Sequence, residues 1–301
     1  MNRSVSELAR VSSGCLEPSG YRPNWMRLSL YSVLHIAAVA APFCYTQDAL
    51  IASAALYFVC GFGVTLGYHR LLTHRSFQTY SLIRTLLAAC GALALLGGPI
   101  DWTGKHRRHH ALSDKPGDPH SPRDGFWWTQ LGWLLMDGAF KPASYTKDLS
   151  KSTALRAIER YGWPINVLFA ASGFATGEVL FDAGMPWLIW AICVRAVFSI
   201  HVAGLVNTIG HGRGPRSFPT PDQSRNVWWV ALLTLGEGWH NNHHASQQSA
   251  AHGRHWFQFD PTYWVICLME AVGLAWDVVH PGSKPDAAAL ARFRTSRNTS
   301  E

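Results

Sequence analysis

The segments GYHRLLTH (residues 67–74), KHRRHH (105–110) and WHNNHH (239–244) hold eight of the fifteen histidines in this 301-residue chain. Imidazole is the commonest transition-metal ligand near neutral pH, and eight imidazoles are more than one ion accepts. These three histidine boxes therefore predict a binuclear metal centre. The predicted ligands in the boxes are His69, His74, His106, His109, His110, His240, His243 and His244.

The spacing within each box gives a first expectation of its geometry. An α-helix turns about 100° per residue, so the H-x-x-H-H spacing of the second and third boxes puts each trio on one face. Each trio can therefore present three nitrogens to one centre. His69 and His74 are five residues apart, about 140° around a straight helix. Either the helix ends between them or they bind different metals, and separate metals or a bent helix end are favoured.

Four further residues are candidates for the same site. In HVAGLVNTIGH (201–211), His211 is a ninth candidate ligand, and Asn207, one turn earlier, is a weak neutral ligand suited to holding a metal-bound water. His120 in GDPH and Glu237 in GEGWH are candidates for orienting a ligand through its second ring nitrogen. For these two, an ordinary loop histidine and a structural carboxylate are the alternatives. The remaining histidines are expected to be ordinary surface or core residues: His35, His201, His252, His255 and His280.

The composition is that of a membrane protein with large polar segments, since 48% of the residues are hydrophobic and 15% are charged. Apolar runs cover residues 28–46, 49–68, 161–177 and 183–210, the last broken only by Arg195. Each run approaches the roughly 20 residues that a spanning helix needs. We therefore expect four transmembrane helices in two hairpins, with the shorter runs 85–100 and 226–236 as buried or interfacial helices.

Every lysine and arginine except Arg195 lies before, between or after the two expected hairpins, and the connections within the hairpins have none. The positive-inside rule then places both termini and all three histidine boxes on the cytoplasmic side. Basic residues next to the spans, facing anionic membrane lipids, account for the net charge of +7 without a nucleic-acid partner.

The expected fold is all-α and multi-pass, and it divides into three parts. Residues 1–27 form a cytoplasmic arm without the apolar core of a signal peptide. Residues 28–280 form the membrane domain, in which a cytoplasmic helical cap holds the histidine boxes. Residues 281–301 are rich in Ala, Arg and Ser and are expected to be a poorly ordered tail.

The ligand type favours redox chemistry. Catalytic zinc sites keep three protein ligands and an open position, whereas eight or nine imidazoles suit two redox-capable ions such as iron. The chain has no Ser-His-Asp pattern, phosphate loop or GxGxxG motif. Oxygen activation is therefore favoured over hydrolysis. A metal-binding transporter is a remote alternative, because it would place ionisable ligands inside the spans, whereas these boxes lie at or beyond the span ends.

The motifs GVTLGYHRLLTHRSF, WTGKHRRHH, RDGFWWTQLGWL, LVNTIGH and SRNVWWVALLTLGEGWHNNHH resemble the membrane fatty acid desaturases of the delta-9 acyl family. The resemblance covers about residues 50–277 and is strongest to the bacterial and plant branch. It implies a four-span, mushroom-shaped protein in which the nine histidines hold two ferrous ions and Asn207 binds one through water. It also implies an acyl tunnel that ends at the di-iron centre.

The implied reaction uses dioxygen and two electrons to convert neighbouring methylenes of a saturated acyl chain into a cis alkene, at the delta-9 position. A hydroxylase on the same di-iron scaffold is the nearest alternative. The resemblance also implies an external electron donor, such as ferredoxin or a b-type cytochrome with its reductase, because the sequence contains no such domain.

The acyl carrier implied by the resemblance is CoA or a glycerolipid. Animal acyl-CoA members have basic residues where this chain has Gly104, Asp137 and Gly138, which argues against the same mode of CoA recognition. Four other basic residues are candidates for contacting a phosphate headgroup or the electron donor, with solvated or lipid-facing charge as the alternative. They are Lys105, Arg107, Arg108 and Arg123.

Overall fold

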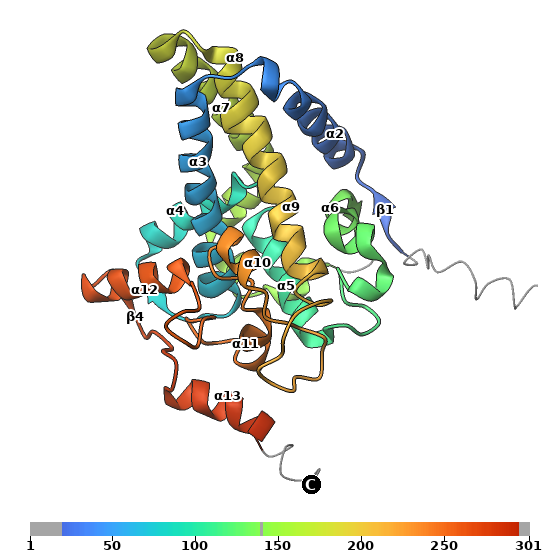
Figure 1. The fold of residues 1–301 in the computed structure, drawn as a ribbon, viewed down its shortest axis with the longest axis vertical. Coiled ribbons are helices and arrows are strands. Elements are labelled where there is room, and N and C mark those ends of the chain that lie inside the picture. The colour runs from blue at the N-terminus through green and yellow to red at the C-terminus, as the bar shows by residue number, and fades with distance from the viewer. Residues whose placement is uncertain (1–19, 139–140, 295–301) are drawn as a thin grey trace, which may run out of the picture.

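The computed structural model describes residues 20–138 and 141–294, and it is mostly helical, as predicted (Figure 1). The α-helices are α2 (Trp25–Val39), α3 (Gln47–Phe62), α4 (Ser81–Ala92), α5 (Pro99–Leu112), α6 (Trp133–Leu135), α7 (Thr153–Phe181), α8 (Gly184–Trp187), α9 (Arg195–Thr208), α10 (Trp228–Leu233), α11 (His240–Ala245), α12 (Pro261–Ala271) and α13 (Lys284–Arg294). Two short antiparallel pairs complete the fold: β1 (Arg22–Pro23) with β3 (Met136–Asp137), and β2 (Gln78–Thr79) with β4 (Ala275–Trp276).

Three segments of π-helix extend or join these helices. The first, Gly63–Thr73, continues α3 into the first histidine box, and the second, Leu188–Val194, joins α8 to α9. The third, Trp128–Gly132, precedes α6. The first segment is buried along its length because α4 packs directly on it. A Cβ at Gly63 would lie 2.2 Å from the backbone nitrogen of Gly91, so glycine is required at this crossing.

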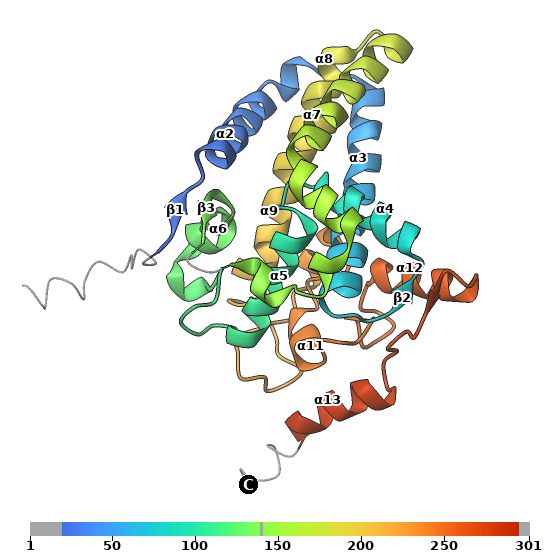
Figure 2. The same cartoon turned by 180° about the vertical axis from the view of Figure 1, so that it is seen from behind.

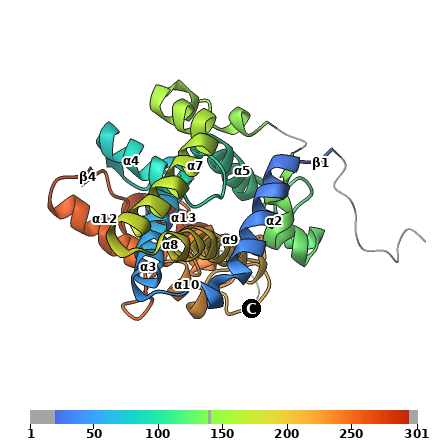
Figure 3. The ribbon, with the colours of Figure 1, turned by 90° about the horizontal axis from the view of Figure 1, so that it is seen from above.

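Within the described residues, three helices are long and apolar enough to cross a membrane. They are Gln47–Thr73 (27 residues), Thr153–Phe181 (29 residues) and Gly184–Thr208 (25 residues), and they match three of the four predicted spans. Together they form a bundle at one end of the molecule, with α2 alongside α9 (Figure 3).

The first predicted span, 28–46, is a shorter helix than expected. Helix α2 has 15 residues and is followed by a single 3-10 turn, Ala41–Phe43. Pro42 lacks the N–H that would continue the helical hydrogen-bond pattern, so α2 ends at Val39. At 1.5 Å per residue α2 is about 22 Å long, below the roughly 30 Å of a bilayer core. The length of α2 alone thus falls short of a fourth span.

The rest of the chain forms a cap at the opposite end of the bundle, where α5 and α11 lie side by side with α13 beneath α11 (Figures 1 and 2). Within the expected tail, residues 281–301, Lys284–Arg294 forms helix α13. The buried carboxylate of Asp286 anchors this helix by accepting hydrogen bonds from Ser246 (2.6 Å) and Arg254 (2.7 Å). Residues 295–301, and residues 1–19 of the expected arm, lie outside the described residues.

Candidate metal centre

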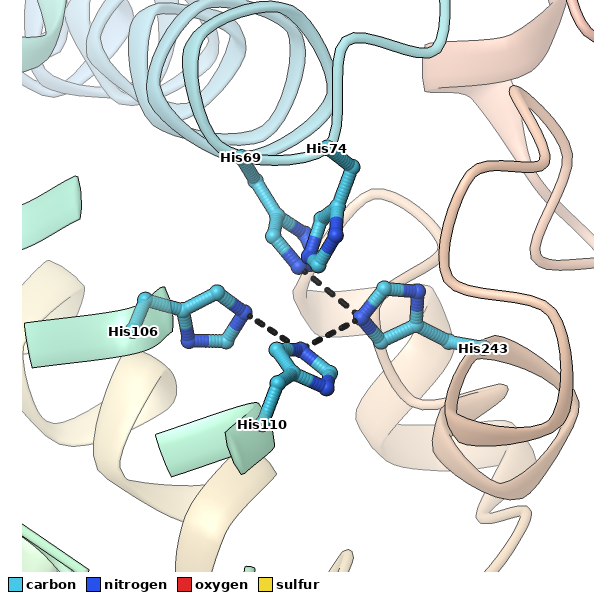
Figure 4. A group of neighbouring side chains, drawn as sticks. All are labelled: His69, His74, His106, His110 and His243. Carbon is cyan, nitrogen blue, oxygen red and sulfur yellow. Dashed lines mark hydrogen bonds between the residues drawn. The ribbon is translucent and has the colours of Figure 1, made fainter. Parts of the chain in front are cut away.

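The nine predicted histidine ligands come together in two groups at the junction of bundle and cap. Group A contains His69, His74, His106, His110 and His243 (Figure 4), and group B contains His109, His211, His240 and His244. Within each group one ring nitrogen from every histidine lies within 4.8 Å of the others.

The Nε2 atoms in each group approach one another closely. In group A, the Nε2 of His243 is 3.1 Å from that of His69 and 3.0 Å from that of His110. In group B, the Nε2 of His240 is 2.9 Å from that of His211 and 3.1 Å from that of His244. The imidazoles thus converge on one point in each group.

The π-helix brings His69 and His74 into the same group. The backbone N–H of His74 donates to the carbonyl oxygen of His69 at 3.1 Å, an i→i+5 bond. This wider turn places the two rings on one side, with their centroids 4.8 Å apart. Both rings lie in group A, which contradicts the expectation of separate metals. The other favoured alternative, a helix end between them, agrees with the structure, because the π segment ends at Thr73 and His74 caps it.

The second and third boxes each contribute to both groups, so the interpretation that a trio can present all three nitrogens to one centre does not hold. The reason is the turn of the helix, since residues four apart differ by about 40° and adjacent residues by about 100°. His106 and His110 therefore face group A together, while His109 faces group B. In the third box the pattern is reversed. His240 and His244 face group B, and His243 faces group A.

Four of the nine candidate ligands present their Nδ1 atoms to carboxylates. Glu237 is hydrogen-bonded to His69 in group A. In group B the partners are Asp118 with His109 (2.9 Å), Asp114 with His211 (3.0 Å) and Asp222 with His244 (2.9 Å). Sequence analysis missed the three aspartates. Two of them follow the second box directly in SDKPGD, the signal from which they could have been found.

The electrostatics favour ionised carboxylates beside neutral imidazoles. Burial alone raises the pKa of Asp118 and Asp222, but His109 and His244 hold both pKa values well below the ordinary range. Burial lowers the pKa of His244 to about 4 despite its hydrogen bond to Asp222. Burial, followed by neighbouring histidines, also lowers the pKa of His106 well below its usual value. Neutral imidazoles offer the lone pairs that a metal needs.

The donor set fits metal ions. Because Nδ1 of His211 and His244 faces a carboxylate, it carries the proton, and Nε2 carries the lone pair. Buried lone pairs about 3 Å apart repel each other unless a cation lies between them. An ion with metal–nitrogen bonds of about 2.1 Å holds ligands at right angles about 3.0 Å apart. Moreover, the buried Nε2 atoms of His74 and His109 have no hydrogen-bond partner among the described residues.

Asn207 and His120 lie beside the groups without belonging to them. Asn207 is buried one helical turn before His211. The His120 ring packs on His109, with centroids 4.3 Å apart, and its Nδ1 is 4.0 Å from Asp118. Asn207, His120 and Glu237 all line one apolar cavity of about 100 Å³. That cavity also touches His69 and His106 of group A and His240 of group B, so it meets both groups.

His252 was not expected to be part of the site, yet it packs against group A. It is fully buried, its ring centroid is 4.3 Å from that of His243, and its Nδ1 is 3.4 Å from Glu237. The carboxylate of Asp260 fixes this position by accepting the backbone N–H of His252 at 2.7 Å. No motif spacing marks His252, because a turn rather than a helix brings it to the site.

The four candidate basic residues differ in their surroundings. Lys105 is buried, paired with Asp101 at 2.8 Å, and lines the apolar cavity. Arg107 is paired with Asp148 at 2.8 Å and donates to backbone carbonyls, and Arg108 donates to the carbonyl of Gly117 at 2.7 Å. Arg123 is exposed. Lys105 and Arg107 are thus both paired with acidic side chains of this chain.

Comparison with known proteins identifies the family. The family model described as fatty acid desaturase matches residues 49–276. The chain belongs to the fatty acid desaturase family. It is 40% identical to the sn-1 stearoyl-lipid 9-desaturase of Anabaena variabilis over 261 residues, which cover 85% of this chain and 93% of the relative.

Two further relatives of this desaturase differ in substrate and position. The delta-9 acyl-lipid desaturase 2 of Arabidopsis thaliana is 38% identical over 266 residues, 86% of this chain and 84% of the relative. An acyl-CoA 5-desaturase of Anemone leveillei is 41% identical over 257 residues, 82% of this chain and 77% of the relative. Family membership therefore assigns an oxidoreductase that desaturates fatty acyl chains.

Proposed function

We propose that this desaturase introduces a cis double bond at the delta-9 position of a saturated acyl chain, with two iron ions, dioxygen and two electrons from an external donor. In the balanced reaction, –CH2–CH2–, O2, two electrons and two protons give –CH=CH– and two waters. The observation that carries this proposal is the apolar cavity that touches both histidine groups. An acyl chain in this cavity lies against both proposed metal positions.

In this proposal, group A holds one iron and group B holds the other, with Asn207 contributing through a water. When bound, the irons supply the one-electron redox chemistry that activates dioxygen. The chain's own contribution is orientation. The carboxylates of Glu237, Asp114, Asp118 and Asp222 fix the tautomer and the ring position of four ligands, and such partners also raise ligand basicity.

The cavity wall positions the acyl chain. Trp102 stacks on His106, with ring centroids 4.9 Å apart, and forms part of the wall with Val64 and Leu96. These side chains exclude water and restrict which methylenes approach the histidine groups. Restricting the reacting geometry in this way sets both the rate and the position of reaction. Specificity therefore depends on the shape of the wall, because a saturated chain offers no polar group to recognise.

We propose a glycerolipid as the acyl carrier in preference to CoA. At the positions where animal acyl-CoA members are basic, this chain uses its residues structurally. A Cβ at Gly104 would lie 2.4 Å from the carbonyl oxygen of Pro142, so no side chain fits there. Asp137 accepts hydrogen bonds from Asn24. Two of the relatives described above are named for lipid-linked substrates, and one is named for acyl-CoA.

We further propose that α2, with its following turn, is the first of four spans in a membrane domain of residues 28–280. Both termini and the cap would then be cytoplasmic. Three observations support this: the three longer apolar helices, the distribution of basic residues, and the position of the cap at the bundle end opposite the α7–α8 turn (Figure 2).

The test is the lipid profile of a bacterial host that expresses the wild type or the His109→Ala variant, read by gas chromatography with mass spectrometry. We expect new cis-9 monounsaturated chains in the wild type alone, with ferredoxin and its reductase co-expressed. A product heavier by one oxygen would instead identify the hydroxylase alternative. Unchanged lipids in the wild type, at verified expression and iron content, would contradict the proposal.

A further inference from the structure

A second cavity, of about 580 Å³, opens in the cap between α5, α11 and α13. It shares no lining residue with the apolar cavity. We call it the cap cleft. Its lining includes polar side chains from the segments that flank the second and third histidine boxes, among them Ser113, Gln247 and Gln248.

The cap cleft reaches both histidine groups at the point where they meet. His110 of group A and His244 of group B both line it, and their ring centroids are 4.6 Å apart. The Nε2 of His110 is 3.0 Å from that of His243, and the Nε2 of His244 is 3.1 Å from that of His240. A redox group at the inner end of the cleft is therefore one imidazole away from either proposed metal position.

The exposed charges that line the cap cleft are positive. Lys115 and Arg292 are exposed, and no ion pair with a described residue occupies either of them. The acidic lining residue, Asp222, is buried and hydrogen-bonded to His244. Helix α13, which supplies Arg292, is fixed to the cap through Asp286 and Arg254, so this charge is held beside the opening. Such a surface complements an acidic partner.

We propose that the cap cleft is the docking site of the electron donor, an acidic one-electron carrier protein whose redox group comes to face His110 and His244. This inference rests on the proposed function. Two successive carriers, each oxidised by one electron, supply the two electrons that reduce dioxygen to two waters together with two protons and the two hydrogens removed from the acyl chain. The substrate and the reductant then reach the histidine groups through separate openings.

The experiment uses the iron-loaded protein in a neutral detergent and two probes, a plant-type [2Fe–2S] ferredoxin and a soluble cytochrome b5. Binding of each probe is measured by biolayer interferometry at several salt concentrations. Product formation is measured with the probe and its NADPH-dependent reductase, and separately as a single-turnover yield after reduction by dithionite. Two variants alter the cleft. Lys115→Glu/Arg292→Glu reverses its exposed charges, and Ala289→Trp fills it without changing the charge. The control Lys147→Glu/Lys151→Glu makes the same change in net charge at exposed residues outside the cleft.

We expect the charge-reversed variant to bind the probe roughly tenfold more weakly, with a reduced salt dependence, and to lose donor-driven turnover to a similar extent. Ala289→Trp should show the same loss of binding, while dithionite-driven yield stays at the wild-type level in both. Wild-type binding in the two cleft variants, an equal loss in the control, or no binding of either probe to the wild type would overturn the proposal.

Two other results have distinct meanings. If the cleft variants keep the carrier but lose binding to vesicles of phosphatidylglycerol, the surface contacts membrane lipid, and the proposal is overturned. If the dithionite-reduced wild type forms no unsaturated product, the proposed function fails, whereas carrier binding still decides the docking site.

Discussion

The backbone N–H of His74 donates to the carbonyl oxygen of His69 across 3.1 Å, and this single π-type hydrogen bond places both rings in group A. Five residues of α-helix would separate them by about 140°. The π segment thus converts the spacing of the first box into a pair of neighbouring ligands. π-Bulges are frequently found at functional sites, and here the function is alignment.

The assignment of ligands to two groups predicts which variants lose the same metal. His243→Ala and His74→Ala should each lower the metal content from two ions to about one per chain, and the His74→Ala/His243→Ala double variant should also keep about one. His243→Ala/His244→Ala, which removes adjacent residues from different groups, should keep almost none. Inductively coupled plasma mass spectrometry on the folded, detergent-purified proteins measures this. Equal metal content in the two double variants would contradict the assignment.

Removing a carboxylate that is hydrogen-bonded to a histidine should lower the metal affinity while all nine histidines remain. Asp118→Asn removes the ionised acceptor for Nδ1 of His109, so metal affinity and turnover should fall roughly ten- to hundredfold. Asp124→Asn changes a nearby carboxylate, at the end of the Pro122–Asp124 turn, for which no hydrogen bond to a histidine occurs among the described residues, and it should behave as wild type. Metal competition with a chelator gives the affinity. Equal values for both variants would show that Asp118 only stabilises the loop.

His252 predicts a site effect at a residue outside the histidine boxes. His252→Ala removes the ring that packs, tilted, against His243 and leaves a void beside Glu237, so metal affinity and turnover should fall about tenfold. His252→Phe keeps an aromatic ring packed against His243 and should recover part of the loss. His255→Ala alters an exposed histidine three residues away and serves as the control. Wild-type affinity in His252→Ala would remove this residue from the site.

The ion pairs of Asp148 predict how the stability of the folded protein depends on pH. Burial alone raises the pKa of Asp148, but hydrogen bonds from Arg107 and Arg75 hold it well below its ordinary value. When folding lowers the pKa of a carboxyl, its ionised form stabilises the folded protein. This stabilisation is complete above the pKa in the unfolded chain, about 3.9, and it is lost as the pH falls through the pKa in the folded protein.

Asp148→Asn should therefore cost about 1 kcal/mol above pH 5, a small figure because solvent screens this partly exposed group. The difference from wild type should shrink as the pH falls below 4. Thermal unfolding in detergent between pH 3 and pH 7 measures this. A difference that is constant over the whole range would exclude the ionised carboxylate as its cause.

The sequence predicted which histidines come together, because histidine spacing reports on a shared site; that they bind metal stays a prediction. All nine histidines lie in the two groups, and three of the four apolar runs are long helices. The division of each H-x-x-H-H box between groups also follows from helix geometry, since 40° and 100° separations point to different sides. The interpretation failed because three histidines on one helix face were assumed to bind the same ion, although their side chains point to two different groups.

Other features depend on tertiary contacts that local patterns do not encode. The π-helix after Gly63 depends on the packing of α4, and the place of His252 depends on a turn fixed by Asp260. Asp286 orders α13 through partners more than 30 residues away. The sequence shows Pro42, which can end a helix, but the apolar run continues past it. The predicted span was therefore longer than helix α2.

The measurement that tests the central claim most directly is the iron content of the purified wild type after anaerobic loading with Fe²⁺, determined together with product yield in a single turnover with dithionite. The account predicts two irons per chain and a cis-unsaturated product that requires both, so that His243→Ala and His244→Ala each retain about one iron and form no product. One iron per chain in an active wild type, or product from either one-iron variant, would contradict a binuclear site built from groups A and B.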